Sequence, residues 1–116
     1  MKILLADDNP SLRSALALML ETRLGACIAA EAARMETLLQ HAADTQPDFI
    51  LLDNELPGLP LTGRIEAIRR MAPQAHIILL SARPDLTPSP SEADRTEYFN
   101  TACPPEQLLS ILQKGN

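Results

Sequence analysis

Short apolar runs alternate with amphipathic stretches along the 116-residue chain. Apolar runs predict five strands, at residues 2–6, 26–30, 49–53, 76–80 and 97–101. Periodic stretches predict helices at residues 10–23, 34–43, 62–71 and 104–114. Such a repeat builds a parallel sheet with helices on both faces, and right-handed crossovers restrict its topology. We therefore expect an α/β doubly wound five-stranded parallel sheet, with the flavodoxin-like order 2-1-3-4-5.

The first predicted helix has clear boundaries. Asn9 is a good N-cap, and Pro10 suits the first helical position. Gly25 ends the pattern. Apolar residues at steps of three and four predict its inward stripe: Leu12, Leu16, Met19, Leu20 and Leu24. The helix at 62–71 is predicted to face inward through Ile65, Ile68 and Met71.

Proline disfavours one of the helices that the alternating pattern would otherwise predict. Three of the ten prolines, Pro84, Pro88 and Pro90, fall within residues 83–95, where a further helix is expected between two strands. Proline inside a helix removes a hydrogen bond and clashes with the preceding turn. The sequence therefore predicts a degenerate fourth helix.

Composition restricts the class of protein. We expect a single domain over residues 1–116, with 46% hydrophobic residues and a net charge of −5. That charge disfavours direct binding to nucleic acid, and no apolar run approaches the ~20 residues of a membrane span. Cys27 and Cys103 fall at opposite edges of the predicted sheet, which excludes a disulfide between them. Two reduced thiols indicate a cytoplasmic protein.

Acidic residues end two neighbouring strands of the predicted sheet. Asp7 and Asp8 follow the first strand, Asp53 ends the third, and Ser81 follows the fourth. Ligands bind at the carboxyl ends of strands near the switch point of such a sheet. Clustered carboxylates need a cation, and oxygen ligands at an open site suit Mg²⁺. An aspartate there could also accept a phosphoryl group as an acyl phosphate.

These residues carry a resemblance to a known family. Four segments match it, at residues 4–10 (LLADDNP), 47–53 (PDFILLD), 56–58 (LPG) and 77–82 (IILLSA). Over essentially its whole length, the sequence resembles the receiver domain of two-component response regulators. The resemblance implies that Asp53 is the phosphoacceptor. It also implies that Asp8 binds Mg²⁺ directly, Asp7 through water, and Glu55 through its backbone carbonyl.

The resemblance implies a switch and also shows a departure. Ser81 takes the place of the switch hydroxyl, and Tyr98 that of the switch aromatic residue. Thr101 stands where the family has a lysine that donates to the phosphoryl group. The only lysines in the chain are Lys2 and Lys114. The departure removes a charge-assisted hydrogen bond of roughly 1.5–3 kcal/mol.

Two functions follow as expectations. The first is a receiver module of a Mg²⁺-dependent phosphorelay, which takes a phosphoryl group on Asp53 from a histidine kinase or phosphotransfer protein. It would catalyse only its own phosphotransfer and dephosphorylation. The alternative is a pseudo-receiver that acts by protein contact without phosphorylation. Arg83 is a candidate for the rim of the site, and a second copy of the chain is a candidate partner. The sequence shows no output domain, so we expect docking to a partner or membership of a longer regulator.

Overall fold

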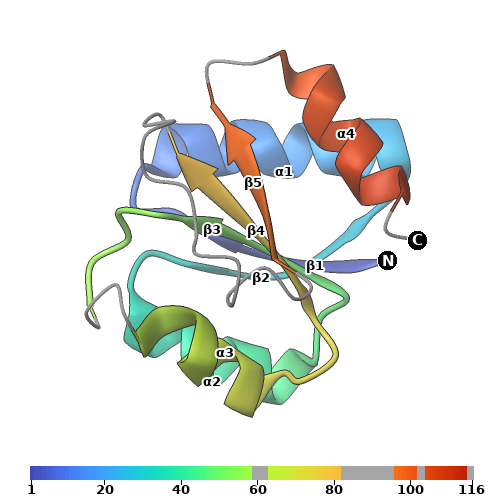
Figure 1. The fold of residues 1–116 in the computed structure, drawn as a ribbon. Helices are drawn as coiled ribbons and strands as arrows, with labels where there is room; N and C mark the ends of the chain where they lie inside the picture. Colours follow the sequence, from blue (N-terminus) through green and yellow to red (C-terminus); the bar gives the residue numbers. More distant parts are fainter. Residues whose placement is uncertain (59–62, 82–95, 102–103, 115–116) are drawn as a thin grey trace.

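A five-stranded parallel sheet organises the computed structural model, which describes residues 1–58, 63–81, 96–101 and 104–114. The strand order is β2-β1-β3-β4-β5, as predicted (Figure 1). Five short segments form it: β1 (Lys2–Ala6), β2 (Cys27–Ala32), β3 (Phe49–Asp53), β4 (His76–Ser81) and β5 (Thr96–Asn100). The chain adds β2 on one side of β1 and then adds β3, β4 and β5 on the other side. The switch point of this sheet therefore lies between β1 and β3.

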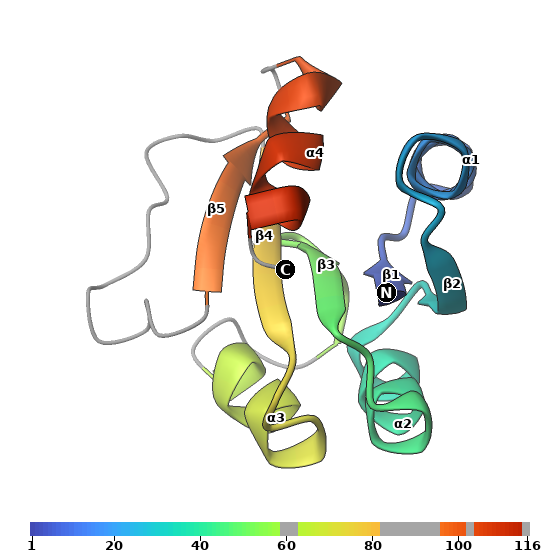
Figure 2. The same cartoon turned by 90° about the vertical axis from the view of Figure 1, so that its right-hand side faces the viewer.

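Four helices cover the two faces of this sheet. They are α1 (Pro10–Leu24), α2 (Met35–Thr45), α3 (Arg64–Met71) and α4 (Pro105–Lys114). The helices α1 and α4 lie on one face, and α2 and α3 lie on the other (Figures 1 and 2). This arrangement explains why β1, β3 and β4 are nearly continuous apolar runs, since both faces of each strand are covered. The predicted degenerate fourth helix, at 83–95, falls outside the described residues.

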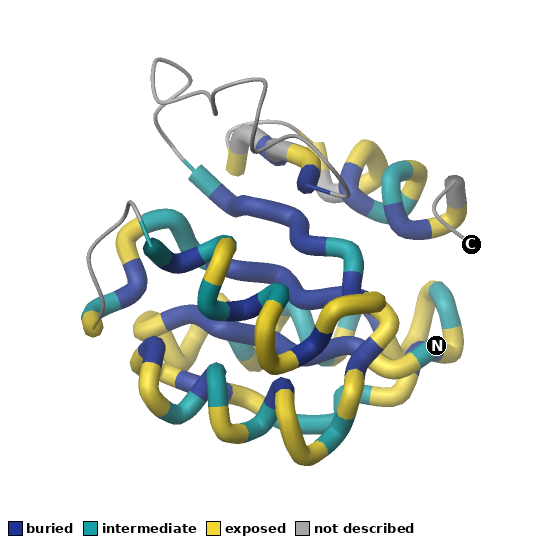
Figure 3. Tube along the Cα trace, turned by 60° about the horizontal axis from the view of Figure 1, so that its bottom comes forward, coloured by how far each residue is buried: buried dark blue, intermediate teal, exposed yellow. Residues whose placement is uncertain are grey.

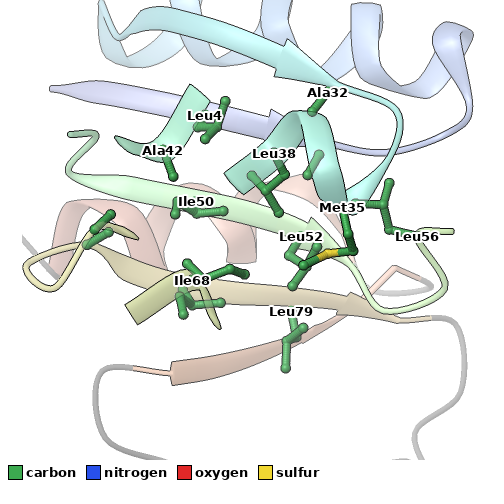
Figure 4. Close-up of a cluster of buried hydrophobic side chains, with 14 residues drawn as sticks. Leu4, Ala32, Met35, Leu38, Ala42, Ile50, Leu52, Leu56, Ile68 and Leu79 are labelled. Atoms are coloured by element: carbon green, nitrogen blue, oxygen red, sulfur yellow. The ribbon is translucent and has the colours of Figure 1, made fainter. Parts of the chain in front are cut away.

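The core has two layers, one on each side of the sheet. Alternate residues of a strand point to opposite faces, so Ile50 and Leu52 pack with α2 and α3, and Phe49 and Leu51 pack on the side of α1 and α4. Figure 4 shows the first layer, in which Met35 lies among the strand side chains. Buried positions follow the strands and the inner sides of the helices, and exposed positions follow the outer sides (Figure 3).

Both predicted caps of α1 are confirmed, and the helix ends at Leu24, one residue later than predicted. The Asn9 side chain accepts from the backbone N–H groups of Ser11 and Leu12 at 3.0 and 3.2 Å. Pro10 opens the helix, and Gly25 follows its end with a left-handed φ of 64°. The turn after α1 thus uses the one residue type that adopts this φ without steric cost.

Three expectations about packing and boundaries need correction. Met71 was expected to face inward, but it ends α3 and is 41% exposed. Leu12 was expected in the inward stripe of α1, but it is 38% exposed because it lies at the edge of a surface pocket. The second strand begins at Cys27 and runs to Ala32, because Ala32 still pairs with Ala6.

Candidate functional site

Three carboxylates meet at the carboxyl ends of β1 and β3. Asp7 and Asp8 follow β1, and Asp53 is the last residue of β3. The register pairs Ala6 with Leu52, so the residues after them are brought side by side. Each of the three residues offers a carboxylate oxygen, and these oxygens all lie within 4.8 Å of one another. Asp7 is buried, Asp53 is half-buried and Asp8 is exposed, so the group opens from the core to the surface.

A pocket of about 210 Å³ surrounds these carboxylates. It brings together most of the residues singled out from the sequence. Its lining is Asp7, Asp8, Asn9, Leu12, Asp53, Glu55, Leu80, Ser81 and Thr101. This lining includes four acidic residues and no basic one among the residues that the structure describes. The pocket is therefore suited to a cation or to a ligand that carries one.

Burial raises the pKa of both Asp7 and Asp53. Loss of solvent is the main reason that the pKa of Asp7 lies above its ordinary value, and the charge of Asp8 adds to the rise. The hydrogen bond from the N–H of Asn9 lowers the pKa of Asp7, and the charge of the Arg13 guanidinium lowers it by a smaller amount. Burial likewise raises the pKa of Asp53, and the carboxylates of Asp7 and Asp8 raise it further. A bound cation would favour the charged form of both groups.

Backbone N–H groups orient these same two side chains. The N–H of Asn9 donates to Oδ1 of Asp7 at 2.9 Å, and the N–H of Glu55 donates to Oδ1 of Asp53 at 3.0 Å. Each bond links the acid to a residue two positions later, which shapes the turn after the strand. The donor set consists of oxygens on a partly solvated surface, which fits the preference of Mg²⁺ for oxygen ligands and retained waters.

Of the two predicted switch residues, Ser81 lines the pocket. Ser81 ends β4, and the backbone N–H of Thr101 donates to its carbonyl oxygen at 2.9 Å. Tyr98 lies in β5 opposite Leu79, but its side chain is not among the described parts of the structure. Arg83 and Cys103 also fall outside the described residues. Cys27 is a free and exposed thiol.

Sequence reasoning missed two arginines beside the site. Arg13 donates from Nη1 to the carbonyl oxygen of Asp7 at 2.6 Å. Arg64 is buried and donates from Nη1 to the carbonyl oxygen of Asn54 at 3.1 Å. Both stand near the beginning of a helix, where the helix dipole disfavours a cation. That unfavourable placement is the signal by which each could have been found.

A second, apolar pocket adjoins the first. It has a volume of about 200 Å³ and lies between α1, the ends of β4 and β5, and α4. Its lining is Leu12, Ala15, Leu16, Met19, Leu80, Phe99, Thr101 and Leu108. Three of these residues, Leu12, Leu80 and Thr101, also line the acidic pocket. Among the described residues, no helix has the length and apolar character needed to cross a membrane.

The sequence is similar to two transcription regulators. It is 27% identical over 116 residues to the transcriptional activator protein ExaE of Pseudomonas putida, covering 98% of this chain and 54% of that protein. It is 33% identical over 118 residues to the DNA-binding transcriptional regulator NtrC of Azospirillum brasilense, covering 97% of this chain and 24% of that protein. The chain thus spans about half the length of the first relative and a quarter of the second.

A solved structure is similar to this chain in both fold and sequence. It is the receiver domain of the sensor histidine kinase PA1611 from Pseudomonas aeruginosa PAO1, which has a magnesium ion coordinated in its active site cleft. The two superpose with a TM-score of 0.80 at 27% identity, over 97% of this chain and 94% of that one. Residues 3–113 match the family described as the response regulator receiver domain. The chain therefore belongs to the receiver domain family of two-component response regulators.

Proposed function

We propose that this receiver domain accepts a phosphoryl group on Asp53 from a histidine kinase or phosphotransfer protein. The observation that carries the proposal is the gathering of the Asp7, Asp8 and Asp53 carboxylates within 4.8 Å in one open pocket. The pocket lies at the carboxyl ends of β1 and β3, where doubly wound sheets bind their ligands. The domain is a signalling module whose only chemistry is its own phosphotransfer and dephosphorylation.

The same carboxylates would hold Mg²⁺. Asp8 and Asp53 would bind it directly, Asp7 through water, and Glu55 through its backbone carbonyl. When bound, the ion neutralises the charge that builds up as a phosphoryl group approaches an anionic site. Family membership supports this assignment, and so does the magnesium ion in the cleft of the PA1611 receiver domain.

Asp53 supplies the nucleophile for the transfer. The N–H of Glu55 holds Oδ1, which leaves Oδ2 as the attacking oxygen. A bond forms between Oδ2 and phosphorus while the bond from phosphorus to the donor histidine nitrogen breaks, and its electron pair returns to the imidazole ring. The product is an acyl phosphate on Asp53. Ser81 lines the same pocket, so its hydroxyl is the group we expect to contact the phosphoryl oxygens and to serve as the switch.

We propose that the domain controls an output function. The relatives are named as transcription regulators and are longer than this chain. We propose that phosphorylation here controls such an output, either in the same polypeptide or through a separate protein. Tyr98 in β5 is the proposed aromatic residue of that switch, and the domain acts in the cytoplasm.

One observation favours a second function. The apolar pocket between α1 and α4 has Leu12, a residue that is 38% exposed, in its lining. Concave apolar sites of this kind are typical binding sites. Together with Thr101 at the lysine position, it favours a pseudo-receiver that binds a partner without phosphorylation.

Intact-mass spectrometry separates the two functions. The protein is incubated with acetyl phosphate and Mg²⁺, alongside Asp53→Ala and the control Asp44→Ala, which alters an exposed acid on α2. A phosphoryl mass gained by the wild type and the control, but lost in Asp53→Ala and with chelator, is the expected result. Uptake that persists in Asp53→Ala would refute the site. No uptake by a wild type that binds Mg²⁺ would favour the pseudo-receiver.

A further inference from the structure

We propose that Arg13 is a positioning residue that holds the turn carrying Asp7 and Asp8 in the geometry that binds Mg²⁺. This inference rests on the proposed metal site. The Arg13 side chain is only 21% exposed, and it makes two contacts. Its Nη1 donates to the carbonyl oxygen of Asp7 at 2.6 Å, and its Nε donates to Oε1 of Glu31 at 2.9 Å.

The contact at Asp7 completes a set of bonds around one residue. The N–H of Asp7 donates to the carbonyl oxygen of Ala32 at 3.0 Å, and its Oδ1 accepts from the N–H of Asn9. Arg13 holds the other backbone polar group of Asp7, its carbonyl. That carbonyl belongs to the peptide bond between Asp7 and Asp8, so fixing it also fixes the direction in which Asp8 leaves the turn.

Glu31 holds the guanidinium in place. Glu31 lies in β2 and pairs in register with Leu5 of β1, so it is attached to the sheet. Arg13 therefore joins β2, the turn after β1 and the beginning of α1 through one planar group. Lysine cannot reproduce this, because an ammonium lacks the fork of fixed donors that reaches two acceptors at once.

The turn after β3 has a similar contact. Arg64, at the start of α3, donates to the carbonyl oxygen of Asn54, next to Asp53. Thus a basic residue near the start of the following helix contacts the backbone of each turn that carries the acids. In both cases the contact places a positive charge near the N-terminus of a helix, where the helix dipole disfavours it.

Charge and geometry act in opposite directions, which makes the proposal testable. The positive charge of Arg13 repels a divalent cation, whereas its two hydrogen bonds order the ligands. Arg13→Lys keeps the charge and loses the fork, so it isolates the geometric effect. Arg13→Gln removes both. The matched control is Arg23→Lys, which makes the same change at an exposed position in the last turn of α1.

The experiment is a calorimetric titration of Mg²⁺ into the wild type, both Arg13 variants and the control. We expect Arg13→Lys to weaken Mg²⁺ binding about tenfold, as loss of groups that support metal ligands does. Arg23→Lys should leave it unchanged. Amide hydrogen exchange of the metal-free proteins gives a second reading, since the Asn9 N–H bonded to Asp7 should exchange faster in Arg13→Lys.

Each outcome decides the proposal. If Arg13→Lys binds Mg²⁺ as tightly as the wild type, the hydrogen bonds of Arg13 do not order the ligands and the proposal is overturned. Tighter binding by Arg13→Gln in the same experiment would show that only the charge of Arg13 matters. An equal loss in the Arg23→Lys control would also overturn it. If the wild type binds no Mg²⁺, the proposed metal site is wrong, and the exchange experiment alone then tests the role of Arg13. Faster exchange of the Asn9 N–H in Arg13→Lys would support Arg13 as the residue that holds the turn, and unchanged exchange would refute it.

Discussion

The backbone N–H of Thr101 donates to the carbonyl oxygen of Ser81 at 2.9 Å, which places these two residues side by side at the ends of β5 and β4. Both line the acidic pocket, together with Asp53. A side chain at position 101 would therefore lie in the same pocket as a phosphoryl group on Asp53. Resemblance to the family aligns its lysine with this position, so threonine here would leave a phosphoryl group on Asp53 without that cation.

Thr101→Lys is expected to increase the extent or the lifetime of phosphorylation. The reason is a restored charge-assisted hydrogen bond, worth roughly 1.5–3 kcal/mol, or about tenfold or more in an equilibrium. Intact-mass spectrometry over a time course after removal of acetyl phosphate measures both quantities. Thr101→Gln has similar reach without the charge and serves as the control. An unchanged time course in the lysine variant would mean that position 101 does not take the role of the family's lysine.

Asp53→Asn is expected to stabilise the metal-free protein at neutral pH. Burial raises the pKa of Asp53, so the folded state holds the proton more tightly than the unfolded state. The wild type therefore loses stability as pH rises from the ordinary pKa of an aspartate through the raised one, and it stays less stable above it. The variant lacks this loss. We expect its free energy of unfolding to exceed that of the wild type by about 1 kcal/mol at pH 7.

Urea unfolding between pH 4 and pH 8 in metal-free buffer measures this difference. The gap between Asp53→Asn and the wild type should shrink as the pH falls, because the wild-type carboxyl then becomes protonated and neutral. Asp44→Asn, on the exposed surface of α2, should show no such gap. A gap that widens on acidification would contradict the raised pKa of Asp53.

Asp8→Asn is expected to remove most of the stabilisation by Mg²⁺. A ligand that binds only the folded state stabilises it by mass action, which gives about 1.4 kcal/mol at ten times its Kd. The variant loses a proposed direct carboxylate ligand at the exposed side of the pocket. Thermal unfolding with Mg²⁺ or with chelator measures the effect. A full Mg²⁺ response in Asp8→Asn would exclude this residue as a ligand.

Gly58→Ala is expected to destabilise the protein more than Gly25→Ala does. Both glycines have positive φ, at 129° and 64°, where alanine costs about 1–2 kcal/mol. A Cβ on Gly58 would also lie 2.7 Å from Cβ of the buried Met35, whereas one on Gly25 meets nothing within 4 Å. Overpacking of this kind adds about 1–3 kcal/mol. Chemical denaturation compares the two variants, and equal losses would show that the contact with Met35 relaxes easily.

Most of the fold could be predicted from the sequence because local and global signals agree in it. The run at Phe49–Asp53 has the length, the apolar character and the terminal acid of a buried parallel strand, and the structure places β3 there. Asn9 and Gly25 mark the ends of α1 through their own backbone preferences. Right-handed crossovers limited the possible topologies, and the order 2-1-3-4-5 was chosen as the common doubly wound order that suits a chain of this length. The structure confirms this order.

Parts of the site could not be predicted because they depend on tertiary contacts. Periodicity could not show that Met71, at the end of α3, turns to solvent, or that Leu12 borders two pockets. The ion pair of Arg13 joins it to Glu31, eighteen residues away, so no local sequence pattern predicts this contact. The acids were found because strand ends meet at one edge of a parallel sheet, which is a topological rule and needs no side-chain detail.

The most direct test of the central claim locates the phosphoryl group itself. Borohydride reduces an aspartyl phosphate to homoserine, and peptide fragmentation then identifies its position. After incubation with acetyl phosphate and Mg²⁺, we predict homoserine at position 53, and none at Asp7 or Asp8. Homoserine at any other aspartate, or a phosphoryl mass on the protein without homoserine at 53, would contradict the assignment of Asp53 as the phosphoacceptor.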